Sequence, residues 1–116
     1  MSGWTPVCAV DALLPDRGAA ALVGDRQVAL FRLAQSTEEG LDLFAVGHRD
    51  PFTGANVIAR GLVGSRGDVP TVASPLHKQV FDLRSGVALD YPGVSLDPWE
   101  VRIMDGVVQV RPQETG

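Results

Sequence analysis

Two loops of this chain carry its only histidines, and in each loop the histidine stands near another side chain capable of chemistry. The first loop holds His48 and Asp50, and the second holds Ser74 and His77. Two histidines and one carboxylate form the ligand set of many non-haem iron sites. A serine beside a histidine supplies a nucleophile and its general base. The sequence therefore raises a metal site and a hydrolytic site as chemical possibilities.

The surroundings of these residues favour a structural role over either chemistry. Asp50 and Ser74 each precede a proline, which is typical of side chains that start turns. Catalytic zinc commonly takes three protein ligands, and a catalytic serine needs a base that a third group orients. The chain also lacks the Gly-x-Ser-x-Gly elbow of many hydrolases. We expect no catalytic residue and no bound metal, and we expect His48 and His77 to hydrogen-bond between the loops.

Short apolar runs between turn residues predict that strands position the two loops. Strands are expected at residues 7–10, 19–23, 27–33, 41–46, 71–73, 80–83, 99–103 and 107–111, with a turn and a further strand between 57 and 70. Gly61, Gly64 and Gly67 are interpreted as turn glycines, and Asp105-Gly106 predicts a hairpin. Eight or nine short strands without a helix of normal length predict an all-β sandwich or small barrel.

The two loops resemble the cluster loops of Rieske proteins, which contain Cys-x-His in the first loop and Cys-x-x-His in the second. The second is often followed by Phe-Asp-Leu-x-x-Gly, and residues 81–86 match that tail. His48 and His77 match the histidines, but Val46 and Ser74 stand at the cysteine positions. A Rieske centre holds one iron with two thiolates and the other with two imidazoles. The resemblance implies a Rieske-like antiparallel β fold with a two-loop subdomain and no cluster.

From about residue 7 to 110 the chain also resembles a narrower family, the small subunits of bacterial assimilatory NAD(P)H-dependent nitrite reductases. The cysteine replacements and two loop phrases carry this resemblance: Arg49-Asp50-Pro51-Phe52-x-Gly-Ala and Ala73-Ser74-Pro75-Leu76-x-Lys78-Gln79. It implies an accessory subunit that binds no cofactor itself and associates with a large subunit. That large subunit is expected to carry FAD, an iron–sulfur cluster and sirohaem, and to reduce nitrite to ammonium.

The loop tips are candidates for the surface that meets the large subunit, because in a Rieske ferredoxin the tip with the histidine ligands meets the redox partner. The candidate docking residues are His48, Arg49, Asp50, Phe52, Leu76, His77 and Lys78. Phe52 and Leu76 have a second interpretation, in which they fill the space that iron and sulfide occupy in a Rieske protein. Two other functions stay open: a stand-alone electron carrier, and a cluster-free module of another reductase or oxygenase.

Composition limits the partners of this 116-residue chain. Its net charge of −4 and pI near 4.9 give no electrostatic basis for binding nucleic acid or an anionic membrane. It has no membrane-length apolar run and no visible signal peptide. Cys8 is the single cysteine, so no internal disulfide forms, and we expect it to be a small buried hydrophobe. The prediction is a cytoplasmic protein with one domain over residues 1–116, a core at about 7–111 and a flexible tail at 112–116.

Overall fold

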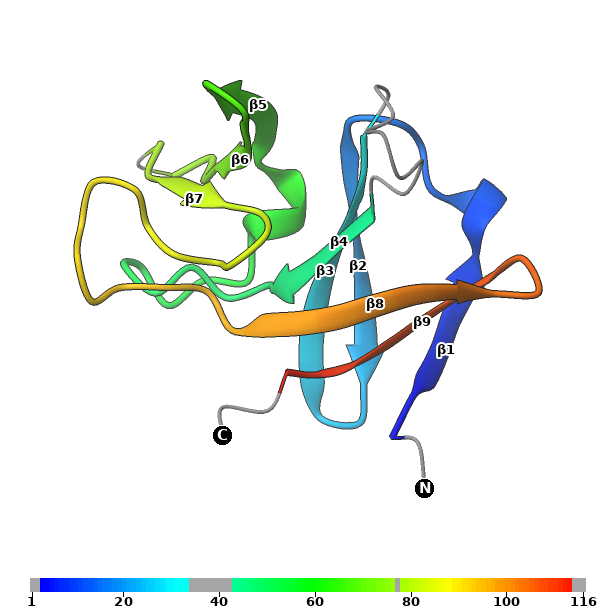
Figure 1. Cartoon of the computed structure of the whole chain (residues 1–116). Coiled ribbons are helices and arrows are strands. Elements are labelled where there is room, and N and C mark those ends of the chain that lie inside the picture. The colour runs from blue at the N-terminus through cyan, green and yellow to red at the C-terminus, as the bar shows by residue number, and fades with distance from the viewer. Residues whose placement is uncertain (1–2, 34–42, 77, 114–116) are drawn as a thin grey trace.

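The computed structural model describes residues 3–33, 43–76 and 78–113, which form nine strands and two single-turn 3₁₀ helices (Figure 1). The strands are β1 (Thr5–Ala9), β2 (Arg17–Val23), β3 (Arg26–Arg32), β4 (Leu43–Gly47), β5 (Leu62–Arg66), β6 (Val69–Ala73), β7 (Val80–Asp82), β8 (Pro98–Met104) and β9 (Val107–Pro112). The helices are η1 (Val10–Ala12) and η2 (Ile58–Arg60). Within the described residues, no helix is long and apolar enough to cross a membrane. The all-β prediction is confirmed.

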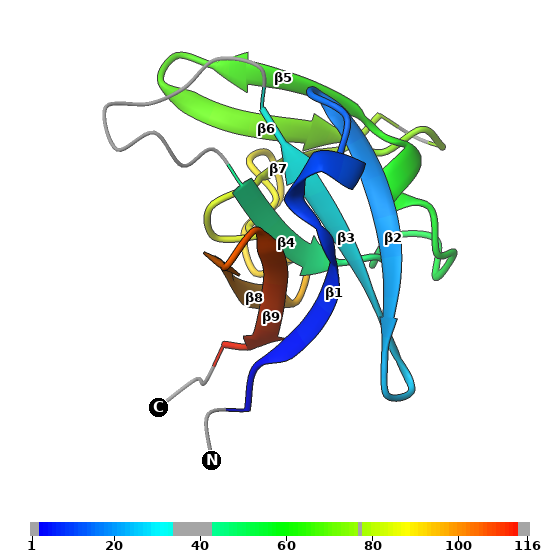
Figure 2. The ribbon, with the colours of Figure 1, turned by 90° about the vertical axis from the view of Figure 1, so that its right-hand side faces the viewer.

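Six strands form one antiparallel sheet in the order β1-β9-β8-β4-β3-β2. The edge strands β1 and β2 approach each other, so the sheet curls into a nearly closed barrel (Figure 2). Arg32 of β3 fastens the connection between these edges, because its guanidinium donates to the carbonyls of Val10 and Leu13 at 3.5 and 3.3 Å. Of the two predicted architectures, the barrel is therefore the one that this sheet adopts.

Both hairpins predicted within this sheet are present. β2 and β3 join through Gly24 and Asp25, one residue fewer than the three-residue loop that the sequence indicated. β8 and β9 join through Asp105 and Gly106, whose φ angles are +54° and +77°. Positive φ at both central residues is the hairpin geometry that Asp-Gly favours. β9 reaches Pro112, the first residue of the predicted tail, and residues 114–116 lie outside the described part of the chain.

A separate three-stranded sheet, in the order β5-β6-β7, lies beside the barrel. η2 leads into this sheet and ends at Gly61, and Gly67 makes the turn between β5 and β6 with a φ of +62°. Gly64 lies inside β5, paired with Thr71, so the prediction that it is a turn glycine is wrong. The position is exposed, and a strand tolerates glycine where no side chain is needed for packing.

β3 lies between two hydrophobic cores and contributes to both. Because successive side chains of a strand point to opposite faces, Val28 and Leu30 belong to the cluster inside the barrel, whereas Ala29 and Phe31 belong to the cluster facing the small sheet. All four side chains are at most 1% exposed. Burial on both faces explains why the sequence of β3 is a continuous apolar run rather than an alternating one.

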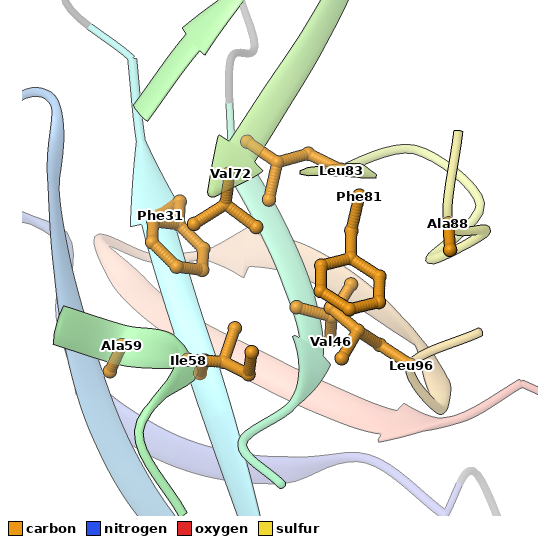
Figure 3. Close-up of a cluster of buried hydrophobic side chains, with 10 residues drawn as sticks. Phe31, Val46, Ile58, Ala59, Val72, Phe81, Leu83, Ala88 and Leu96 are labelled. Carbon is orange, nitrogen blue, oxygen red and sulfur yellow. The ribbon is translucent and has the colours of Figure 1, made fainter. Parts of the chain in front are cut away.

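The core between the barrel and the small sheet is where both loops begin. Val46 of β4 lies there with Phe31, Ile58 and Phe81 (Figure 3). η2 also packs on the barrel at Gly18 of β2, where an added Cβ would lie 2.1 Å from the carbonyl oxygen of Ala59. The segment that follows the first loop is therefore fixed against the barrel wall.

Candidate functional site at the two loops

Two loops meet at the junction of the barrel and the small sheet. Loop A, residues 48–57, connects β4 to η2, and loop B, residues 74–79, connects β6 to β7. His77 of loop B lies outside the described residues. Loop A leaves the barrel and loop B leaves the small sheet, so contacts between them join the two sheets at this end of the molecule.

His48, the first residue of loop A, is a buried structural residue. Its backbone N–H donates to the carbonyl of Gln27 at 3.1 Å, and its Nδ1 accepts the backbone N–H of Ala59 at 3.1 Å. The side chain is 6% exposed. Burial, and to a smaller extent the positive charge of Arg60, holds the pKa of His48 below its usual value of 6.5. His48 is thus a neutral imidazole that carries its proton on Nε2 and ties loop A to η2.

Asp50 provides the polar link between the loops. Its carboxylate Oδ1 accepts the backbone N–H of Phe52 at 2.8 Å, which is the turn that the sequence predicted at this position. Its Oδ2 accepts the hydroxyl of Ser74 in loop B at 2.6 Å. Asp50 is fully buried and Ser74 is 1% exposed. A charge-assisted hydrogen bond shielded from water is stronger than a neutral one at the surface, so this pair holds the loops together.

Ser74 also organises loop B through its backbone. Its N–H donates to the carbonyl of Gln79 at 2.8 Å, and its carbonyl accepts the N–H of Lys78 at 2.9 Å. Its hydroxyl accepts the N–H of Leu76 at 3.4 Å, as a turn-starting serine does. Since the hydroxyl is buried and committed to Asp50, Ser74 is not placed to act as a nucleophile.

Apolar side chains surround this polar link. Phe52 is partly buried, with its ring centroid 6.0 Å from that of Phe81 and 5.1 Å from that of Tyr91. Leu76 is 49% exposed at the tip of loop B. Phe52 therefore fills space next to the core, as one of its two interpretations proposed, whereas Leu76 is presented to solvent.

The structure separates the predicted docking residues into two groups. Arg49, Leu76 and Lys78 are exposed, and Phe52 is partly so. The side chain of Asp50 is fully buried and that of His48 is 6% exposed, so neither belongs to the exposed surface of the loop tips. His77 lies outside the described residues. A hydrogen bond between the loops exists, but Asp50 and Ser74 make it rather than the histidines. His48 bonds within its own connection to η2, and the expectation for His77 lies outside the described residues.

Comparison with known proteins gives the family. A family model described as a Rieske-like 2Fe–2S domain matches residues 3–111. The nitrite reductase (NADH) small subunit of Escherichia coli K12 is 41% identical over 111 residues, covering 96% of this chain and 99% of that protein. This chain belongs to the nitrite reductase small-subunit family. That family supplies a component of an oxidoreductase, and its Rieske-like fold agrees with the prediction.

Two further relatives show the fold and the presence of a related segment in a longer protein. The solution structure of the Escherichia coli protein NirD superposes with a TM-score of 0.84 at 39% identity, covering 98% of this chain and 100% of that one. A Klebsiella oxytoca protein named nitrite reductase NAD(P)H large subunit is 37% identical over 111 residues. Those residues cover 96% of this chain but 11% of the Klebsiella protein. In that protein the related segment is therefore part of a much longer polypeptide.

The side chains at the loops do not fit a Rieske cluster. Such a centre needs two thiolates and two imidazoles, whereas the two loops meet through a carboxylate and a hydroxyl that bond to each other. Cys8, the only cysteine, lies on β1 and pairs with Val108 of β9. In the sheet order, β1 is three strands away from β4, the strand that leads into loop A. It is only partly buried, and this burial raises the pKa of its thiol. Among the described residues, no group of three or more His, Cys, Asp or Glu side chains gathers to hold a metal.

The structure favours a different correspondence for loop A. Val46, the residue matched to the first cysteine, lies within β4, as the strand expected at 41–46 implies; it pairs with Ala29 and Pro98 and is 1% exposed in the core. It therefore does not lie opposite Ser74, which is where a first cysteine would have to be. Asp50 lies there instead. The spacing Asp50-x-Phe52 is the same as Val46-x-His48, so spacing alone did not distinguish the two alignments.

Tyr91 is a site residue that sequence reasoning missed. It lies outside both loops, in the connection between β7 and β8, yet its ring packs edge-on against Phe52 of loop A. It is the only tyrosine in the chain and is 45% exposed. A lone aromatic in a segment rich in turn residues was the available signal, but nothing in the sequence indicated its partner.

Proposed function

We propose that this chain is a cluster-free accessory subunit of an NADH-dependent nitrite reductase, and that it acts by binding the large subunit. The observation that carries the proposal is the combination of family membership with loops that lack cluster ligands. The large subunit is expected to hold FAD, an iron–sulfur cluster and sirohaem and to reduce nitrite to ammonium. The proposal places the protein in the cytoplasm, where NADH is available.

The Klebsiella relative supports the partner. A large subunit that contains a segment related to this whole chain keeps the two parts in one polypeptide. In this protein the corresponding association would be between two chains. The segment then needs a surface that recognises the large subunit.

In this proposal, Asp50 and Ser74 take the places of the two cysteines, and Phe52 takes that of the first histidine. The hydrogen bond between Asp50 and Ser74 joins the loops, as the iron–sulfur cluster does in a Rieske protein. Phe52 supplies apolar bulk against Phe81 and Tyr91. The loops thus keep a defined shape without metal, which a docking role requires.

The proposed docking surface consists of the exposed loop residues Arg49, Leu76 and Lys78 and the partly exposed Phe52. It combines two cations with two apolar side chains on a chain whose net charge is −4. This arrangement suits a partner surface with an apolar centre and an acidic rim. Leu76 is the best single probe, because it is half exposed and contributes little to the core.

The experiment is a binding measurement with the purified large subunit, combined with iron analysis of this chain. Wild type should bind and restore NADH-dependent nitrite reduction, and the isolated chain should contain no iron. Leu76→Asp should weaken binding by roughly tenfold or more, because it places a charge in the apolar centre of the interface. The matched control is Leu14→Asp, at an exposed leucine between η1 and β2 (57% exposed).

Each outcome bears on a different part of the proposal. If wild type does not bind the large subunit, the accessory-subunit function is wrong. About two irons per chain in anaerobically purified protein would favour a stand-alone electron carrier instead. Binding of Leu76→Asp as tight as wild type would move the docking surface away from the loop tips.

A further inference from the structure

An open pocket of about 560 Å³ lies beside loop A, outside the contact between the loops. The β2–β3 turn, the end of β4, loop A and the approach to β8 all contribute to its walls. Its lining includes the charged side chains Asp25, Arg26, Arg49 and Asp97, together with His48 and Trp99. None of these side chains takes part in the hydrogen bond between Asp50 and Ser74.

The guanidinium of Arg26 forms part of one wall of the pocket. Arg26 lies 4.6 Å above the ring centroid of Trp99, and its Nη2 lies 3.5 Å from Oδ2 of Asp97. Stacking on an aromatic ring limits the rotation of a guanidinium and leaves its N–H edges available. Arg26 thus already compensates the charge of Asp97 and still has donors to offer.

Two further donors at this pocket have no hydrogen-bond partner among the residues that the structure describes. Arg49 is exposed and, among the described residues, makes no hydrogen bond or ion pair. His48 uses Nδ1 to accept from Ala59, so its Nε2 carries the proton. Among those same residues no buried side-chain nitrogen or oxygen lacks a partner, so the unbonded Nε2–H is open to solvent.

The charges and the size of the pocket together select a class of ligand. Two arginines and two aspartates make its formal charge zero; Asp97 pairs with Arg26, and Arg49 is the cation without an ion-pair partner among the described residues. Arg26, Arg49 and His48 all line the pocket and carry N–H groups, and charged N–H donors of this kind bind carboxylates. The volume exceeds that of a small free anion and leaves space for the main chain that carries such a group.

We propose that this pocket receives a carboxylate-bearing peptide segment of the large subunit, with Arg49 as its principal ion-pair partner. The inference rests on the proposed function, because it names a second contact with the same partner. Arg49 belongs both to the loop-tip surface and to the pocket, so the two contacts are continuous. The loop tips supply the apolar part of the interface, and the pocket supplies a charged anchor beside it.

The first arm of the test uses the isolated chain and a small probe. Acetyl-Gly-Glu-Gly-amide is titrated into labelled protein, and the NMR signals of the Arg49 and Arg26 side chains and of the His48 Nε2–H are followed. We expect saturable shifts with a dissociation constant of order millimolar, which corresponds to about 4 kcal/mol. The matched neutral probe, acetyl-Gly-Gln-Gly-amide, should produce none. Equal shifts from both probes would show that no carboxylate is recognised and would overturn the proposal.

The second arm measures affinity for the large subunit. Arg49→Glu should weaken binding by about tenfold or more and reduce its dependence on salt, because it replaces an attractive charge with a repulsive one. The control is Arg17→Glu, which makes the same charge change at an exposed arginine at the start of β2 and should change affinity less than about twofold. Arg49 has no partner within the described structure, so its replacement leaves the fold intact.

The two arms distinguish failure of this inference from failure of the proposed function. If wild type binds the large subunit and Arg49→Glu binds equally well, the pocket is not the anchor and Arg49 is not part of the docking surface, while the accessory-subunit function stands. If wild type does not bind at all, the accessory-subunit function is wrong, and the peptide titration alone decides whether the pocket recognises a carboxylate.

Discussion

The buried hydrogen bond between Ser74 and Asp50 should contribute measurably to the stability of the whole domain. Ser74→Ala removes the hydroxyl that lies 2.6 Å from Oδ2 of Asp50. Among the described residues no other donor reaches Oδ2, and Asp50 is fully buried, so water does not replace the lost partner without a rearrangement. Hydrogen bonds to charged groups contribute about 1.5–3 kcal/mol, and an unsatisfied buried acceptor adds a further cost. We expect Ser74→Ala to lower the free energy of unfolding by about 2–3 kcal/mol.

Urea denaturation followed by tryptophan fluorescence measures this loss. In a domain of this size, about 1 kcal/mol corresponds to roughly 4 °C in Tm, so the variant should melt about 8–12 °C lower than wild type. The matched control is Ser65→Ala, an exposed serine on β5. Exposed positions of this kind usually change stability by less than about 0.5 kcal/mol.

A double-mutant cycle separates the hydrogen bond from the other effects of each substitution. Asp50→Ala also removes the acceptor for the N–H of Phe52, so its single effect is larger than that of the bond alone. The coupling energy between Asp50→Ala and Ser74→Ala should nevertheless be about 2 kcal/mol, because the double mutant leaves no buried charge without a partner. A coupling energy near zero, or a Ser74→Ala variant as stable as Ser65→Ala, would refute the reasoning that this bond replaces a metal as the link between the loops.

Two further predictions concern how loop A is fixed to the barrel. Gly18→Ala should destabilise the domain by about 3 kcal/mol or more, because its Cβ would lie 2.1 Å from the carbonyl oxygen of Ala59. Gly64→Ala, whose added Cβ would lie 3.5 Å from Oγ1 of Thr71, should be tolerated in the same urea experiment. The folded pKa of His48 is lowered, so its contribution to stability is complete above about pH 6.5 and is lost as the pH falls from there through the folded pKa. Urea midpoints at about pH 5 and pH 7.5 should therefore differ less for His48→Gln than for wild type. An equal difference in the two proteins would contradict the assignment of this pH dependence to His48.

Features that depend on neighbouring residues were predictable from the sequence. The Asp105-Gly106 hairpin follows from the positive φ that both of its residues adopt easily. The turn at Asp50 follows from a side chain that bonds the backbone two residues later. The strands of the barrel follow from apolar runs between turn residues. The burial of β3 on both faces did not follow from its run alone, because it depends on the second core.

Features that depend on residues far apart in the chain were not predictable in the same way. Val46-x-His48 and Asp50-x-Phe52 have equal spacing, and the histidine made the first pair look like the cluster motif. Only the position of loop B decides between them, because the residue opposite Ser74 is Asp50. Ser74 and Asp50 were each interpreted correctly as turn residues, but their contact joins positions 24 residues apart.

In the proposed correspondence, a carboxylate and a hydroxyl stand where a Rieske protein has two thiolates, and this changes what the loops are able to do. A cluster links two loops through four metal–ligand bonds and also carries an electron, so its loss removes both the link and the redox function. One short hydrogen bond and the packing of Phe52 restore the link, but neither group takes up an electron. In the proposed cluster-free subunit, a defined loop shape is useful only if the shape itself is recognised by a partner. For this reason the exposed side chains on that framework, Leu76 and Arg49 above all, are the positions at which substitutions should affect assembly without affecting folding.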